Sequence, residues 1–301
     1  MITMRSSAQD PGLPATNLGL TTMGDAVAPP PGLFYNNYTQ VYQMNSFRGA
    51  TGDRLPGDLK VNSLLSLHQL VYISRLHLLA GNVHFTAMLP VVKITASGTA
   101  PLPVVNQGVL SDVTIGAGIQ WYDKKLFNKS FWHRVELDLT VPSGAYHKAD
   151  QINASGHLYT AAIYYSFTYF LTEKLSIGSR NQLNYNFKQI GTVVKPGAFY
   201  HINYAMDYKV LNTLHIAAVG YYLGQFNQDS YKGNSNYFQD NFGVTDTRER
   251  VLGIGSGVSY TTPGGIFLEG KVFFETAVQN RSQGLRPTLR MAVPLFIHQK
   301  K

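Results

Sequence analysis

The chain has 301 residues and a formal net charge of +8, and it contains no cysteine. Disulfides, thiolate metal sites and cysteine nucleophiles are therefore excluded, and the basic residues are too scattered for a nucleic-acid-binding face. Charged residues make up only 14% and aromatic residues 12% of the chain. The sequence contains no run of about 18 apolar residues, so no transmembrane helix is predicted. This composition is typical of a membrane β-barrel, whose apolar residues occupy alternate positions.

The first 37 residues are rich in proline, glycine and small apolar residues and show no strand periodicity. They form either a disordered leader or a segment folded into the lumen, because a barrel of about twelve strands leaves interior space. In the second case residues 1–37 are a lumen plug with a stiff apolar part, Pro29, Pro30, Pro31, Leu33 and Phe34. Residues 1–30 contain no apolar secretory signal, so the chain is either cytoplasmic or a mature form whose signal was removed.

Alternation of apolar and polar side chains predicts strands from residue 38 onward. The alternation is clear at 83–91, 112–122, 132–141, 175–186, 200–208, 252–260, 268–275 and 289–295. It is weaker at 38–48, 62–76 and 214–226, which we also interpret as strands. We therefore predict an all-β chain: an antiparallel transmembrane β-barrel of about twelve strands over residues 38–297, followed by a tail at 298–301.

The connections between these strands differ in length in a regular way. Short turns such as "FLTEKL" and "YTTPGGI" contain typical turn residues. Between them we expect long polar loops near 46–61, 95–110, 143–157, 187–198, 227–248 and 277–286. Alternating short and long connections indicate an outer-membrane barrel, with tight turns on the periplasmic side and long loops outside.

The stretch 132–141 shows which face of the sheet meets water. Its charged residues Arg134, Glu136 and Asp138 alternate with apolar residues over the length of a strand that crosses a membrane. The apolar row should face lipid and the charged row the lumen, and the sheet must close because lipid cannot pair backbone groups. The same reasoning predicts these lumen residues: Arg134, Glu136, Asp138, Arg180, Asp207, Glu269, Lys271, Glu275 and Arg290.

The sequence offers no convincing catalytic motif. "GIFLEGK" resembles part of a phosphate-binding loop, but it lies within a predicted strand and Val272 stands where Ser or Thr is needed. There is no Gly-x-Ser-x-Gly, no His-x-Ser and no His-Glu-x-x-His. We interpret Glu136 and Asp138, with Arg134 beside them, as lumen charges rather than an acid–base pair. We therefore expect no catalytic residue, no metal site and no cofactor.

Four blocks carry a resemblance to a known family: "SDVTIGAGIQWY", "DLTVPSGAY", "VGYYLGQFNQDS" and "ETAVQNRSQG". In this order they resemble a Gram-negative outer-membrane channel family named for the meta-cleavage pathway of phenol degradation. The likeness covers residues 31–297. It implies a twelve-stranded barrel that admits small, often hydrophobic molecules, with a segment inside it ahead of the first strand. This chain departs from the pattern by continuing past Phe296 with "IHQKK", whereas such chains usually end on an aromatic residue.

The sequence therefore favours a monomeric channel in the bacterial outer membrane that takes up small, hydrophobic or aromatic molecules passively. Its expected partners are the lipid bilayer and a small-molecule substrate, with no nucleic acid. Two alternatives stay open. An outer-membrane lipid-modifying enzyme would need a nucleophile and a base within hydrogen-bonding reach. A soluble β-barrel that binds a hydrophobic ligand would not fractionate with membranes.

Overall fold

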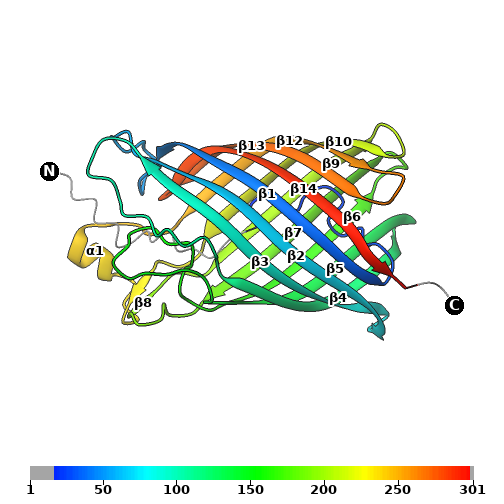
Figure 1. The fold of residues 1–301 in the computed structure, drawn as a ribbon, viewed down its shortest axis with the longest axis horizontal. Helices are drawn as coiled ribbons and strands as arrows, with labels where there is room; N and C mark the ends of the chain where they lie inside the picture. The colour runs from blue at the N-terminus through cyan, green and yellow to red at the C-terminus, as the bar shows by residue number, and fades with distance from the viewer. Residues whose placement is uncertain (1–16, 299–301) are drawn as a thin grey trace.

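The computed structural model describes residues 17–298, which form a closed barrel of antiparallel strands (Figure 1). Consecutive barrel strands pair with each other, and β1 closes the barrel against β14. The barrel strands are β1 (Gly32–Phe47), β2 (Lys60–Leu78), β3 (Gly81–Ser97), β4 (Val113–Leu126), β5 (Lys129–Val141), β6 (Thr160–Phe170), β7 (Leu175–Asn186), β9 (Phe199–Lys209), β10 (Leu214–Gln225), β12 (Arg250–Thr261), β13 (Phe267–Gln279) and β14 (Ser282–Ile297). The predicted all-β barrel of about twelve strands is thus confirmed.

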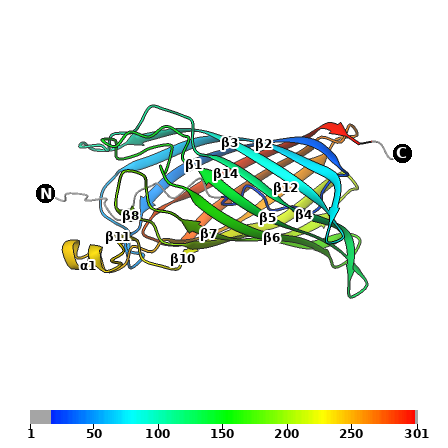
Figure 2. The ribbon, with the colours of Figure 1, turned by 90° about the horizontal axis from the view of Figure 1, so that it is seen from below.

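The two ends of the barrel differ (Figure 2). At the short-turn end lie the start of β1, the end of β14 and tight turns such as Leu79–Ala80 between β2 and β3. The long-loop end carries the connections 48–59, 98–112, 142–159, 187–198 and 226–249. Two of these loops pair through β8 (Val194–Lys195) and β11 (Ser230–Tyr231), and the last contains α1 (Tyr237–Phe242). No helix within residues 17–298 is long and apolar enough to cross a membrane.

The expected long loop at 277–286 is wrong. Strands β13 and β14 continue through this region, and only Asn280 and Arg281 separate them. Asn280 has a φ of 53°, a left-handed conformation that asparagine tolerates better than most residues. Its side-chain amide donates to the carbonyl oxygens of Asp246 and Arg248 in the neighbouring loop. The polar sequence that suggested a loop therefore forms a tight hairpin, and the strict alternation of connection lengths fails here.

Successive side chains of the barrel strands point alternately outward and inward, and the outward rows are mainly apolar. Ile115, Leu137 and Leu289 are 50%, 62% and 64% exposed on the outside. On the neighbouring positions Glu136, Asp138 and Thr288 are buried inside the barrel. The outward row suits lipid and the inward row suits water or polar groups, as in membrane barrels. The side assigned to each row from the alternation is therefore confirmed for these strands.

The barrel begins earlier than expected, because β1 starts at Gly32 and not at residue 38. Leu33 and Phe34 are consequently wall residues of β1 rather than part of a separate segment. Strand β6 had no clear alternation of its own, but its residues pair fully with β5 and β7. At the other end, strand β14 extends to Ile297 and His298 follows it. Residues 1–16 of the expected plug and 299–301 of the expected tail lie outside the described residues.

The long loops are fastened to one another by carboxylates. Asp112, only 2% exposed, accepts hydrogen bonds from the backbone N–H groups of Gly144 and Gly156 and from the Ser155 hydroxyl. The Thr99 backbone N–H and hydroxyl donate to Asp58 and lower the pKa of its exposed carboxyl. Connections that are far apart in sequence are thereby joined over the long-loop end of the barrel.

Candidate functional site: the lumen and its N-terminal segment

Residues 17–31 run through the interior of the barrel before β1 begins, and we call them the lumen segment. Its backbone is held by side chains from several strands. The Gly19 N–H donates to Asn203 on β9 over 3.0 Å, and Lys271 on β13 donates to the Leu20 carbonyl over 2.7 Å. Further along, Gln120 on β4 donates to the Ala26 carbonyl over 3.0 Å. Inward polar side chains thus satisfy backbone groups that form no sheet or helix.

Asp25 is the charged anchor of the lumen segment. Its carboxylate lies 3.2 Å from the Arg134 guanidinium and 3.8 Å from that of Arg180, and it accepts a 2.6 Å hydrogen bond from Ser166. Arg180 also lies over the Tyr164 ring, 3.5 Å from its centroid. The three partners come from β5, β6 and β7, so one carboxylate ties the segment to three adjacent strands. A buried charge is tolerated when it is paired and hydrogen-bonded in this way.

A second anchor lies on the opposite wall. Glu269 accepts hydrogen bonds from the Thr22 hydroxyl at 3.2 Å and from the Met23 N–H at 3.3 Å. Lys271 lies 3.0 Å from the same carboxylate, and both side chains are fully buried. Arg290 approaches Glu269 to 4.0 Å. The lumen segment is therefore held at two opposite walls of the barrel, at each of which acidic and basic side chains are paired.

Apolar contacts fill the space between the anchors. Leu18 and Met23 belong to a buried cluster with Tyr221 and Phe273 of the wall. Gly19 has a φ of 73°, and a Cβ there would lie 2.6 Å from the Phe273 ring, so only glycine suits both the backbone and the space. On the other side Leu20 packs against Tyr38 and Leu67.

The inward glycines of β12 make room for this packing. A Cβ on Gly253 would lie 2.3 Å from the Tyr221 ring. A Cβ on Gly257 would lie 2.9 Å from the Lys271 side chain and 3.1 Å from the Met23 sulfur. The run of glycines on one face of this strand therefore allows close approach of large side chains, as expected of glycine inside a strand.

All nine predicted lumen residues point into the barrel, but they form separate groups. Arg134 and Arg180 meet at Asp25, and Glu269, Lys271 and Arg290 form the second anchor. Of the remaining four, Glu136, Asp207 and Glu275 take other partners, and Asp138 lines a cavity toward the long-loop end of the barrel. Glu136 lies 2.7 Å from His84 and accepts a hydrogen bond from Tyr164, whereas Asp207 lies 2.6 Å from His215.

Glu275 belongs to a third group, with partners that the sequence did not single out. It lies 3.0 Å from Arg286 and accepts hydrogen bonds from Tyr42 at 2.9 Å and Tyr221 at 2.7 Å. Arg286 also donates to Gln40 over 2.8 Å. The lumen residues predicted from the sequence did not include Asp25, Arg286 or His84. Arg286 lies in the stretch that was taken for a loop, and Asp25 lies in a segment without periodicity, so neither had a pattern to place it.

The expected plug residues need correction. Pro29 and Pro30 are exposed and Pro31 is half-buried. Leu33 lies on the outward row of β1, while Phe34 points inward and packs against Ala28 and Ile73. The proline triplet thus leads into β1, because proline cannot donate to a sheet ladder. The buried apolar side chains of the lumen segment are instead Leu18, Leu20, Met23, Ala26 and Ala28.

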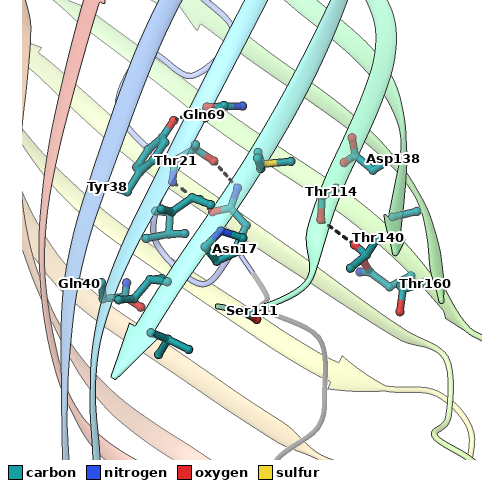
Figure 3. A pocket seen from close by; sticks show the side chains of 18 of the residues that line it. Asn17, Thr21, Tyr38, Gln40, Gln69, Ser111, Thr114, Asp138, Thr140 and Thr160 are labelled. Carbon is teal, nitrogen blue, oxygen red and sulfur yellow. Dashed lines mark hydrogen bonds between the residues drawn. The ribbon is translucent and has the colours of Figure 1, made fainter. Parts of the chain in front are cut away.

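The lumen segment leaves a cavity on each side of itself. The smaller cavity, of about 240 Å³, lies toward the long-loop end and includes Ser111 and Asn153 (Figure 3). The larger cavity, of about 590 Å³, lies toward the short-turn end and includes Phe170 and Gly264. Both are lined by Thr21, Tyr38, Gln69 and Arg180. The barrel interior is therefore two chambers that meet at the lumen segment.

Residues 44–291 match the family described as "Putative MetA-pathway of phenol degradation". The chain belongs to this family. A comparison with curated proteins found no match. The fold is similar to that of the COG4313 outer membrane channel from Pseudomonas putida F1, with 17% identity, a TM-score of 0.77 and coverage of 90% of this chain and 98% of that one. A weaker similarity links it to the translocator domain of the autotransporter NalP from Neisseria meningitidis, with 9% identity, a TM-score of 0.49 and coverage of 89% and 90%.

Proposed function

We propose that the protein is a bacterial outer-membrane channel through which small hydrophobic or aromatic molecules enter by diffusion. The observation that carries this proposal is the pair of chambers inside a closed barrel whose outer surface is apolar. Two further findings support it: the family name refers to phenol degradation, and the structure with a TM-score of 0.77 is an outer membrane channel.

The proposed mechanism assigns no catalytic residue and no cofactor. The lumen charges brace the wall and hold the lumen segment, which acts as the constriction between the chambers. Because most of these charges are paired within the wall, a passing solute meets few free charges. Neutral molecules should therefore pass more readily than ions, which would lose hydration without gaining a counter-charge. The barrel needs no second copy for this role, so we propose a monomer.

Uptake of labelled toluene by Gram-negative cells that lack their own porins tests the function. Cells that express this chain should take up toluene faster than cells expressing an unrelated, closed outer-membrane barrel. Equal initial rates at equal barrel abundance would contradict the proposal. The comparison barrel controls for changes in membrane permeability that any inserted protein causes.

A second candidate function is favoured by a cluster of hydrogen-bonded polar side chains on the outer surface of β1 and β2. Ser66 Oγ lies 3.3 Å from His68 Nε2 on β2, and His68 Nδ1 lies 2.7 Å from the Tyr35 hydroxyl on β1. Asn37 donates to Ser66 Oγ over 3.0 Å. These half-buried side chains are on the outward row, where polar groups are costly. A nucleophile, a base and a residue that orients the base are the minimum for acyl transfer.

In that role Ser66 Oγ would attack the carbonyl carbon of a lipid ester and pass its proton to His68. The departing alcohol would take this proton, and water would then release the fatty acid from Ser66. Release of fatty acid from labelled phospholipid vesicles by the purified barrel tests this activity, with Ser66→Ala as the control. If the wild-type chain and Ser66→Ala release equal amounts, the group only satisfies its own hydrogen bonds.

A further inference from the structure

The lipid-facing row of β7 continues beyond the point where the strand ends. Leu183 and Tyr185 on its outward face are 50% and 49% exposed, and Phe187, which follows the last strand residue Asn186, is still 45% exposed. The rings of Tyr185 and Phe187 meet edge to face at 5.2 Å. Aromatic side chains gather where a membrane barrel leaves the hydrocarbon. This row therefore marks the edge of the bilayer at the long-loop end, on this side of the barrel.

Lys195 lies against this row from the loop that follows β7. It belongs to β8, the short strand that pairs with β11 at the long-loop end (Figure 2). Its ammonium group donates a 2.7 Å hydrogen bond to the Tyr185 hydroxyl and lies 4.1 Å from the centre of the same ring. A cation near a tyrosine ring is attracted by the ring electrons as well. The outward tyrosine thus holds a positive charge at the level where lipid headgroups begin.

Two further lysines come from the same pair of loops. Lys188 follows Phe187 directly and is exposed. Lys232 is also exposed, and its backbone N–H donates to the Val193 carbonyl beside β8 over 3.0 Å. The pairing of β8 with β11 therefore gathers three lysines over one side of the barrel. We call Lys188, Lys195 and Lys232 the lysine patch.

The lysine patch has no acidic partner in the part of the chain that the structure describes. No carboxylate of residues 17–298 forms an ion pair with any of its three amines. Two arginines at the same end of the barrel are paired: Arg248 lies 2.9 Å from Asp246, and Arg281 lies 3.1 Å from Glu249. Like charges held in one region repel each other, and an anion placed among them relieves this repulsion. The patch is thus open to an anion from outside the protein.

The position of the patch selects a lipid rather than a soluble anion. Lys195 is held against a ring of the lipid-facing row, and Lys188 directly follows the last side chain of that row. A molecule that satisfies both features needs acyl chains for the row and phosphate for the lysines. Lysine binds phosphate as a point charge and therefore imposes no strict geometry on it. An anionic lipid supplies both parts in one molecule.

The end of the barrel decides which lipid this is. The long loops of an outer-membrane barrel lie outside the cell, so the lysine patch borders the outer leaflet. This leaflet of the Gram-negative outer membrane is built from lipid A, a disaccharide that carries phosphate groups and several acyl chains. Phospholipids fill the inner leaflet. Lys129 and Lys174, in contrast, lie at the short-turn end and border the inner leaflet.

We propose that the lysine patch is a binding site for lipid A of the outer leaflet. The phosphates lie among Lys188, Lys195 and Lys232, and the acyl chains cover the lipid-facing row of β7. This site goes beyond the proposed channel function, because solutes cross the lumen whereas this surface lies outside the wall. Bound lipid A would tie the joined loops 187–198 and 226–249 to the membrane.

Native mass spectrometry of the full chain in detergent micelles measures lipid binding directly. The probes are lipid A with its phosphates, the same lipid A after enzymatic removal of the phosphates, and phosphatidylglycerol, an anionic phospholipid. Each lysine beside an anionic lipid contributes about fivefold in affinity. We therefore expect phosphorylated lipid A to bind roughly tenfold to a hundredfold tighter than the dephosphorylated form, and tighter than phosphatidylglycerol.

Three variants assign the effect to the patch. Lys188→Gln/Lys195→Gln removes two of its charges and should lower the affinity for lipid A about twenty-five-fold. Tyr185→Phe removes only the hydroxyl that holds Lys195 and should lower the affinity less. Lys129→Gln/Lys174→Gln makes the same change of charge at the short-turn end and should leave the affinity unchanged. Migration on unheated gels shows whether each barrel is folded.

Equal binding of phosphorylated and dephosphorylated lipid A by the wild-type chain would overturn the proposal. Equal affinity of the wild-type chain and Lys188→Gln/Lys195→Gln for lipid A would overturn it as well. If phosphatidylglycerol binds as tightly as lipid A and the double variant loses both, the patch accepts any anionic lipid and the assignment to lipid A is wrong. None of these results bears on the toluene-uptake test, because the variants leave the lumen unchanged.

Discussion

The carboxylate of Asp25 lies 3.2 Å from the guanidinium of Arg134, although the two residues are 109 positions apart in the chain. Asp25 lies at the centre of the lumen segment, and Arg134 lies in the middle of β5. The same carboxylate also reaches Ser166 and Arg180. One acidic side chain therefore pairs with two arginines of the wall and fixes the segment in the lumen.

Replacing Asp25 by asparagine should loosen the segment and add positive charge to the lumen. Breaking a buried ion pair by removing one partner costs about 3–5 kcal/mol, and contact with lumen water would reduce this cost. We expect more frequent current fluctuations and a shift of the reversal potential toward anion selectivity in planar bilayers. Asp240→Asn, on the exposed helix α1, is the matched control. Unchanged recordings for Asp25→Asn would show that the ion pairs do not hold the segment.

The two faces of β5 give a second prediction. Leu137 is 62% exposed on the outside, whereas its neighbour Glu136 is 3% exposed inside the barrel. An arginine that faces lipid near the bilayer midplane costs about 2–4 kcal/mol, so Leu137→Arg should lower folding stability by this amount. Glu136→Gln keeps a hydrogen-bonding group for His84 and Tyr164 and should cost about 1 kcal/mol. Urea unfolding in lipid vesicles measures both, and equal costs would contradict the assignment of faces.

The sequence could predict the barrel because lipid and water select different side chains on alternate positions of a strand. Strand β7 is an example: its predicted range of 175–186 agrees with the structure. The same signal fails where the inward row is apolar as well. On β1 the inward row includes Phe34 and Tyr38, which pack against Ala28 and Leu20 of the lumen segment. Because the inward row is apolar here, the alternation disappears, and the predicted start of the strand lies six residues too late.

The partners within the lumen could not be predicted for a different reason. Alternation shows that Arg134 and Glu275 point inward, but it does not show what they meet across the barrel. Their partners Asp25 and Arg286 are distant in sequence and become neighbours only when the sheet closes and the segment enters it. Alternation therefore assigns the nine residues to the inward face, whereas their grouping into separate clusters required the structure.

The glycines of β12 give a third prediction. A Cβ on Gly253 would lie 2.3 Å from the Tyr221 ring, which is held by a hydrogen bond to Glu275 and by its contact with Phe273. Because this ring cannot move freely, Gly253→Ala should cost about 1–3 kcal/mol, the usual range for overpacking. Gly264→Ala is the control, since its nearest neighbour would lie 3.9 Å away. Equal unfolding midpoints for the two variants would show that the Tyr221 ring moves aside to make room for the added methyl group.

Deleting residues 17–28 should join the two chambers into one. The lumen segment separates cavities of about 240 and 590 Å³, and its backbone is bound by Asn203, Lys271 and Gln120. The deletion ends before β1, so the wall strands remain complete. We expect a higher single-channel conductance than for the full chain, measured at the same salt concentration. A conductance equal to that of the full chain would show that these residues do not obstruct the lumen.

Ion selectivity follows from the balance of charges in the wall and the loops. The described lumen clusters contain five basic residues, Arg134, Arg180, Lys271, Arg286 and Arg290. They face the acidic residues Asp25, Glu269 and Glu275 directly, with Glu136, Asp138 and Asp207 nearby. The lumen is thus close to neutral, and most of the net charge of +8 must come from elsewhere in the chain.

Charges in loops and turns act on ions only through water, where screening limits their range to about 8 Å at physiological salt. We therefore expect a small conductance with a slight anion preference that weakens as the salt concentration rises. The reversal potential across a salt gradient, recorded at two mean concentrations, measures both effects. Strong cation selectivity would mean that Glu136, Asp138, Glu269 and Glu275 act on passing ions as free charges. It would contradict the ion pairs that Lys271 and Arg286 make with Glu269 and Glu275.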